Sequence, residues 1–241
     1  MKPKVICHIM GSVDGKVLVD RWSQPYDGQP MTELMRVYAE LGASLQTDAW
    51  TFGKNTITEI FTEKFQGRTH AKYTSQSVTS VFKVEGSSKR KFIAIDPEAD
   101  IFYTSNTLRG DDIVVVVGKY ASDEYLVFLR KMKISYLVVE SISNLEGILR
   151  TLNKEFGITS ISLQGGGGLN AGMLKQGMID ELSYVVYPGI DGTANSVSIF
   201  NYRGDNDQSP MQGQTLQLFD VQQKDMGIVW LRYKVCKKAV D

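Results

Sequence analysis

Four consecutive glycines at 165–168 constrain this chain more than any other feature of its sequence. Residues 158–163 before them predict a strand, and residues 169–176 after them predict a helix closed by Gly177. Each glycine in ordered structure costs about 0.5–1 kcal/mol relative to alanine, so four in a row indicate a geometric requirement. Bare backbone between a strand and a helix presents free N–H groups at the positive helix end. The pattern favours a phosphate or dinucleotide site over a tight turn with surplus glycine.

The glycine run departs from two common phosphate-binding motifs. A Rossmann fingerprint would place its third glycine at Asn170 and would belong to the first βα unit of the fold, whereas this turn lies late in the chain. A P-loop would continue into Gly-Lys-Ser/Thr, which is absent here. The glycine run therefore predicts that the ligand carries a phosphate, but it does not identify the ligand.

Strand and helix patterns alternate along most of the chain. The apolar run 5–10 predicts a buried first strand, and residues 32–41 predict a helix with Gly42 as its stop. Further strands are predicted at 49–53, 91–96, 112–117, 136–140, 158–163 and 182–187. Helices are predicted from Asn55 and over 124–132, 145–156 and 169–176. Residues 216–222 and 228–235 predict a hairpin around Gly227.

This order predicts an α/β fold with a mainly parallel central sheet flanked by helices and an antiparallel C-terminal hairpin. Residues 61–90 are polar and without sustained periodicity, so we expect an insertion or flap there. No repeat or low-complexity linker divides the chain. The sequence therefore predicts one domain over residues 1–241.

Charge and residue counts exclude several classes of function. Lys+Arg and Asp+Glu both total 27, which favours neither nucleic acid nor an anionic membrane as a partner. No apolar stretch approaches a membrane span of about 18 residues, and the short apolar run at 5–10 is not a signal peptide. Two histidines and two cysteines show no metal-ligand spacing, and His8, in an apolar strand, is expected to be a satisfied core residue. We expect a cytoplasmic protein without a metal.

Three blocks of sequence resemble, in order, the pyrimidine reductases of riboflavin synthesis. They are 9–16 with its Gly-Ser-Val-Asp-Gly-Lys turn, 52–56 with Phe-Gly-Lys-Asn-Thr, and 164–170 with Gln-Gly-Gly-Gly-Gly-Leu-Asn, which is followed by 177–182 and Tyr187-Pro188. The resemblance implies a dihydrofolate-reductase-like fold, NADPH as the hydride donor and a homodimer. It implies reduction of a pyrimidine or pteridine-like small molecule.

The resemblance also implies roles for individual residues. The substrate is expected between Ser12, Asp14 and Gln164, with Asp14 as the catalytic carboxylate. A turn-forming role for Asp14 ahead of Gly15 is an equal alternative. Pro97 falls where the family lines the adenosine site. The residues expected to contact the cofactor are Met10, Trp22, Gly53, Thr56, Gly165, Gly166, Gly167, Gly168, Leu169 and Asn170.

The chain departs from the family pattern at its substrate residues. Gln164 replaces a glutamate that binds the substrate ring, the Asp-Asp-Pro expected near 60–62 is absent, and no arginines clearly stand where a ribose phosphate would bind. The cysteines and histidines of a fused zinc deaminase are also missing. Two classes of function stay open: an NADPH-dependent reductase, and a nucleotide-binding sensor or regulatory module without turnover. A generic α/β domain with a structural glycine turn is a third reading.

Overall fold

The computed structural model describes residues 1–61, 80–86, 90–204 and 211–237. Contacts within the chain gather into two compact units. The terminal unit comprises residues 4–47 and 162–241, and the central unit comprises residues 1–3 and 48–161. The single domain expected over residues 1–241 stays a prediction.

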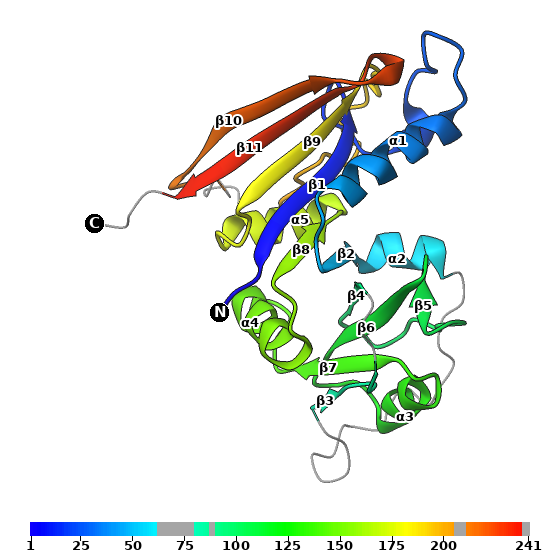
Figure 1. Cartoon of the computed structure of the whole chain (residues 1–241), viewed down its shortest axis with the longest axis vertical. Helices are drawn as coiled ribbons and strands as arrows, with labels where there is room; N and C mark the ends of the chain where they lie inside the picture. The colour runs from blue at the N-terminus through cyan, green and yellow to red at the C-terminus, as the bar shows by residue number, and fades with distance from the viewer. Residues whose placement is uncertain (62–79, 87–89, 205–210, 238–241) are drawn as a thin grey trace. The chain divides into compact units, whose positions relative to one another are not determined.

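The sheet of the terminal unit combines the two ends of the chain (Figure 1). Its strands are β1 (Lys4–Ser12), β9 (Glu181–Tyr187), β10 (Gln214–Gln223) and β11 (Val229–Lys237), in the order β10-β11-β9-β1. β1 and β9 are parallel, whereas β11 is antiparallel to both β9 and β10. The C-terminal hairpin predicted around Gly227 is therefore confirmed; its turn contains the short 3-10 helix η2 (Asp225–Gly227).

Helix α1 (Met31–Ser44) covers one face of this sheet because its apolar side chains recur at helical spacing. Its buried residues pack into a core with the side chains that β1, β9 and β11 direct to the same face. This core comprises Met10, Trp22, Leu34, Val37, Leu41, Val185, Tyr187, Met226, Ile228 and Trp230. A second helix, α5 (Gly167–Lys175), and a 3-10 turn, η1 (Val19–Arg21), complete the unit.

Gly42 does not end α1, so this prediction was wrong. The helix continues to Ser44, and Gly42 lies inside its last turns. A Cβ atom at Gly42 would lie 3.1 Å from the imidazole of His8, which is closer than most side-chain contacts. The glycine is thus needed for the close approach of β1 and α1, and not for termination.

The central unit contains a mainly parallel sheet. Strands β2 (Ala49–Gly53), β4 (Lys91–Asp96), β6 (Asp111–Gly118) and β7 (Ser135–Val139) run parallel in the order β2-β4-β6-β7. The middle of β6 is buried valine, as expected for a parallel strand covered on both faces. The short strands β3 (Val81–Phe82) and β5 (Thr107–Leu108) add antiparallel pairs to β7 and β6.

Each helix of the central unit begins within one residue of its predicted start. They are α2 (Lys54–Ile60), α3 (Asp123–Lys131) and α4 (Leu145–Phe156). The side chains of Ser122 and Asn144 cap the amino ends of α3 and α4, and Gly157 ends α4 with a φ of 69°. Strand β8 (Ser160–Leu163) begins in this unit and ends in the terminal unit.

The predicted α/β fold with parallel strands and a C-terminal antiparallel hairpin is confirmed. Of the insertion expected at 61–90, residues 62–79 and 87–89 lie outside the described residues, and Val81–Phe82 forms β3. In the described ranges, no helix is long and apolar enough to cross a membrane. The same ranges hold no group of His, Cys, Asp and Glu side chains that could bind a metal ion.

Candidate dinucleotide-binding site

The four glycines connect β8 to α5, and their roles differ. Gly165 has a φ of 104°, a conformation that side chains disfavour. The peptide bond from Gly165 to Gly166 is cis. Gly167 has no room for a side chain, because a Cβ atom would lie 2.2 Å from the carbonyl oxygen of Ser198. Two of the glycines are therefore explained by the fold alone.

Gly168 has neither constraint. It is the second residue of α5, is exposed, and a Cβ atom there would meet no atom within 4 Å. Nothing in the described chain requires glycine at this position. An open position on the first turn of a helix is where a bound group can approach the backbone closely.

The amino end of α5 has no side-chain cap. Its N-cap residue is Gly166. The first intrahelical hydrogen bond runs from the Asn170 N–H to the Gly166 carbonyl at 3.1 Å. The N–H groups before Asn170 therefore have no intrahelical acceptor, and they lie at the positive end of the helix dipole. The first turn of α5 contains no acidic residue to compete for them. This geometry suits an anionic group such as a phosphate.

A segment at 196–201, which we call the strap, holds this turn in place. The Asn201 N–H donates to the Gly167 carbonyl at 2.9 Å, and the buried Asn170 amide donates to the Ile199 carbonyl at 2.9 Å. The strap is in turn joined to the turn after β1 by the Ile199 N–H, which donates to the Gly15 carbonyl at 3.0 Å. Sequence reasoning missed the strap, because irregular backbone has no periodic pattern.

Asp14 joins the turn after β1 to the loop that follows β9. Its carboxylate accepts the Ser12 hydroxyl at 2.6 Å and the N–H groups of Asp191 and Gly192 at 3.2 and 2.9 Å. These bonds, led by the one from Ser12, lower the pKa of Asp14 to about 2. The carboxylate is therefore ionised at neutral pH. This is the pattern of a structural carboxylate, and its catalytic role stays a prediction.

Gln164 lies half-buried at the end of β8, immediately before the glycines. Its amide nitrogen donates to the Ser162 hydroxyl at 3.2 Å. Within the terminal unit, Gln164 also lies near α1, because a Cβ atom at Gly42 would be 3.4 Å from its amide nitrogen. Gln164 thus borders the glycine turn as expected, but it contributes no charge.

Met10 and Trp22, both predicted to contact the cofactor, lie in the core of the terminal unit. Their side chains are 7% and 4% exposed. The Trp22 indole stacks on Tyr187, with ring centres 5.3 Å apart, and its N–H has no hydrogen-bond partner among the described residues. Both roles stay predictions.

His8 is a satisfied core residue, as predicted. Its Nε2–H donates to the Tyr38 carbonyl at 3.2 Å, so its Nδ1 accepts the Ser183 hydroxyl at 2.9 Å. The Trp230 indole donates to the same Ser183 oxygen at 2.7 Å. Burial lowers the pKa of His8 to about 4, and the ring is neutral at physiological pH.

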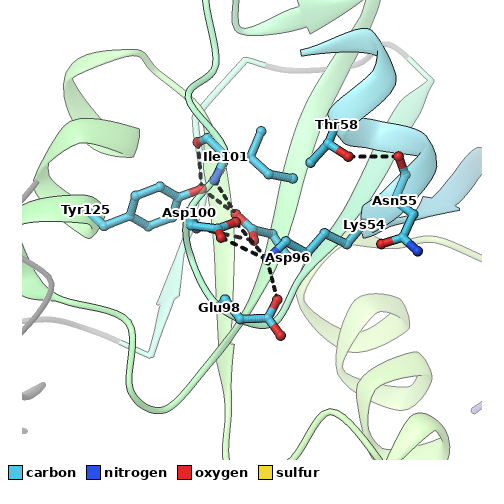
Figure 2. Close-up of polar contacts among 8 residues, drawn as sticks. All are labelled: Lys54, Asn55, Thr58, Asp96, Glu98, Asp100, Ile101 and Tyr125. Carbon is cyan, nitrogen blue, oxygen red and sulfur yellow. Dashed lines mark hydrogen bonds and ion pairs between the residues drawn. The ribbon is translucent and has the colours of Figure 1, made fainter. Parts of the chain in front are cut away.

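The central unit carries the other two predicted cofactor residues. Gly53 is the N-cap of α2, and Thr56 lies partly exposed in its first turn. Beside them, Lys54 contacts the carboxylates of Glu98 and Asp100 at 2.6 and 2.9 Å (Figure 2). The resemblance did not single out this ion-pair cluster.

The loop that carries these acidic residues follows β4 and is anchored by Asp96. The buried Asp96 carboxylate accepts the Tyr125 hydroxyl at 2.7 Å and the Ile101 N–H at 3.2 Å (Figure 2). Burial raises the pKa of Asp96, because removal from water disfavours the charged form. Pro97, expected at an adenosine site, accepts the Gly118 N–H at 3.3 Å. These bonds fix the loop at the carboxyl ends of β4 and β6, where open α/β sheets bind ligands.

Solved structures resemble this chain over 98% of its length. A pyrimidine reductase-like protein from Corynebacterium diphtheriae matches with a TM-score of 0.67 at 18% identity, over 93% of its own chain. RibD from Acinetobacter baumannii matches with a TM-score of 0.63 at 17% identity, over 58% of its chain. The riboflavin biosynthesis reductase Rib7 from Saccharomyces cerevisiae matches with a TM-score of 0.56 at 15% identity, over 90% of its chain. These likenesses show the fold alone.

The family follows from the sequence match. The chain spans less than two thirds of RibD. A search of curated proteins found no match. The family model of the RibD C-terminal domain matches residues 3–230, which is most of the chain. The chain therefore belongs to the RibD C-terminal domain family.

Proposed function

We propose that this protein is a reductase that takes a hydride from NADPH and delivers it to a pyrimidine or pteridine-like small molecule. The observation that carries the proposal is Gly168, an exposed glycine that the fold does not require, on the uncapped first turn of α5. Two comparisons support the reaction type. The chain belongs to the RibD C-terminal domain family, and one of the structures that resemble it is named as a riboflavin biosynthesis reductase.

The glycine turn is proposed to hold the diphosphate of the cofactor. The first turn of α5 offers N–H donors without a competing carboxylate, and Gly168 leaves space for a phosphate to reach them. NADPH, when bound, supplies the hydride. Gly53 and Thr56 of the central unit, with Met10 and Trp22 of the terminal unit, remain the proposed further cofactor contacts.

The chain's own contribution to the reaction is proposed to be binding and orientation. Orientation of two reactants can lower a barrier by about 7–11 kcal/mol, so few acid or base groups are needed. Asp14 is ionised at neutral pH and has no proton to give, so the proton is assigned to water. Ser12, Asp14 and Gln164 are proposed as substrate contacts through their hydroxyl, carboxylate and amide groups.

One observation favours the second candidate, a nucleotide-binding sensor or regulatory module. Gln164 is neutral and its amide nitrogen is already bonded to Ser162, so the substrate side of the turn offers less charge than the resemblance implies. This candidate predicts cofactor binding without turnover. The homodimer and the cytoplasmic location, both expected from the sequence, stay predictions.

Two measurements test the proposal. Thermal unfolding with NADPH at 100 times its dissociation constant is expected to show stabilisation by about 2.7 kcal/mol. Loss of the reduced-nicotinamide absorbance is then followed with pyrimidine ribosyl phosphates and pteridines as candidate substrates. Stabilisation with turnover supports the reductase, and stabilisation without turnover of any candidate supports the sensor. If neither NADPH nor NADH stabilises the chain, both the reductase and the sensor are contradicted.

A further inference from the structure

The strap at 196–201 lies between two turns of the terminal unit and is hydrogen-bonded to both. One is the glycine turn, and the other is the turn after β1, residues 12–17, which carries two of the proposed substrate contacts. No residue of the strap belongs to a helix or a strand. A segment of this kind has no ladder of hydrogen bonds of its own, so its position depends on the groups to which it is bonded.

Three hydrogen bonds join the strap to the turn after β1. Each has a backbone carbonyl as acceptor, and their lengths are 3.0, 3.0 and 3.1 Å: the Ile199 N–H to Gly15, the Val17 N–H to Val197, and the Lys16 ammonium to Ser196. These bonds hold three successive residues of the turn, 15–17. Ser12 and Asp14 precede them directly, so the strap supports the segment that places both side chains.

Two hydrogen bonds join the strap to the glycine turn and to α5. The Asn201 N–H donates to the Gly167 carbonyl, and the Asn170 amide donates to the Ile199 carbonyl, each at 2.9 Å. Because the Asn170 side chain is buried, water does not compensate for loss of this bond. Ile199 therefore belongs to both sets of bonds, as a donor to the turn after β1 and as an acceptor from α5.

Close packing leaves the strap little freedom between the two turns. A Cβ atom at Gly167 would lie 2.2 Å from the Ser198 carbonyl oxygen, and a Cβ atom at Gly11 of β1 would lie 2.8 Å from the Ile199 side chain. The strap thus touches the backbone of both neighbours at positions that have no room for a side chain. Since packed interiors transmit strain, a displacement of one turn is passed through the strap to the other.

We propose that the strap is a positioning element, which sets the turn after β1, and with it Ser12 and Asp14, from the position of the glycine turn. Asn170 is then a positioning residue that acts through Ile199. A ligand that orders the glycine turn also orders the turn after β1, so that binding at one turn favours binding at the other. The positioning role needs no ligand, whereas this coupling rests on the proposed function.

Amide hydrogen exchange of the free chain, followed residue by residue by NMR, tests the positioning role. Asn170→Ala is expected to speed exchange at the N–H groups of Ile199 and Val17 about fivefold, the effect of losing one hydrogen bond, although their own acceptors stay in place. The matched control is Asn153→Ala on α4, whose amide donates to the Ile158 carbonyl at the same 2.9 Å. It is expected to leave both rates unchanged. Wild-type rates in Asn170→Ala overturn the proposal, and so does equal acceleration in the two variants.

The opposite direction is tested from the other end of the strap. Lys16→Met removes the bond to Ser196 and is expected to speed exchange at the Asn201 N–H about fivefold, whereas Lys16→Arg keeps a donor and is expected to preserve the wild-type rate. The control is Lys4→Met, which removes an ion pair with Glu181 at the other end of β1. Wild-type exchange at Asn201 in Lys16→Met overturns the proposal.

Saturating NADPH tests the coupling. In the wild type it is expected to slow exchange in the glycine turn and also at Val17 and Ile199, and in Asn170→Ala in the glycine turn alone. Slower exchange confined to the glycine turn of the wild type overturns the coupling and leaves the proposed function intact. No change at either turn contradicts the proposed function, and the variants of the free chain then decide the positioning role by themselves.

Discussion

Gly168→Asp separates the stability of α5 from its capacity to bind a diphosphate. The second position of a helix favours a carboxylate by about 0.3–1 kcal/mol, and the site has open space, so the variant is expected to fold at least as well as the wild type. A bound phosphate about 5 Å away is repelled by about 3 kcal/mol at an effective dielectric constant of 20. The expected loss is about 100-fold in NADPH affinity.

The control for this variant is Gly168→Asn, which has nearly the same shape without the charge. Calorimetric titration of NADPH into the wild type and both variants, with thermal unfolding of each, gives the comparison. We expect Asn to weaken binding far less than Asp, and neither to lower the melting temperature. If both variants bind NADPH as tightly as the wild type, the diphosphate does not lie on α5 and the reasoning is refuted.

Three other perturbations test the supports of the site. Gly167→Ala forces a Cβ atom against the Ser198 carbonyl and is expected to lower the free energy of unfolding by about 1–3 kcal/mol in urea titrations. A urea unfolding curve identical to that of the wild type would contradict this. The pKa of His8 falls from 6.5 to about 4 on folding, so the neutral ring stabilises the folded chain above pH 6.5 and this stabilisation is lost as the pH falls to 4. The loss amounts to about 3 kcal/mol in the free energy of unfolding. A His8→Asn variant whose stability depends on pH in the same way would contradict this. Asp14→Asn is expected to lower the melting temperature at pH 7, where the carboxylate is ionised, and an unchanged temperature would show that its bonds to the loop after β9 are unimportant.

The sequence predicted elements whose signals are local. The apolar runs of β1 and β9, the helical spacing of α4 and the glycine that ends α4 are signals carried by neighbouring residues, so the sequence located these elements closely. The glycine turn was located for the same reason. β3 and β5, with two residues each, are too short to show a period.

Features that depend on distant contacts could not be predicted. Gly42 has the pattern of a helix stop, and only the approach of His8 shows why it lies inside α1. Of the four glycines, the sequence could not tell Gly167, which packs against Ser198, from the open Gly168. The bonds from Asp14 to the loop after β9 join residues 177 and 178 positions apart, which no local signal records.

The central claim is that the backbone from Gly165 to Asn170 binds the diphosphate of a nicotinamide dinucleotide. Titration calorimetry of the wild-type chain with NADPH, and in parallel with NADH, tests it most directly. We expect saturable uptake of one NADPH per chain. Absence of binding by both reduced dinucleotides at saturating concentration would contradict it.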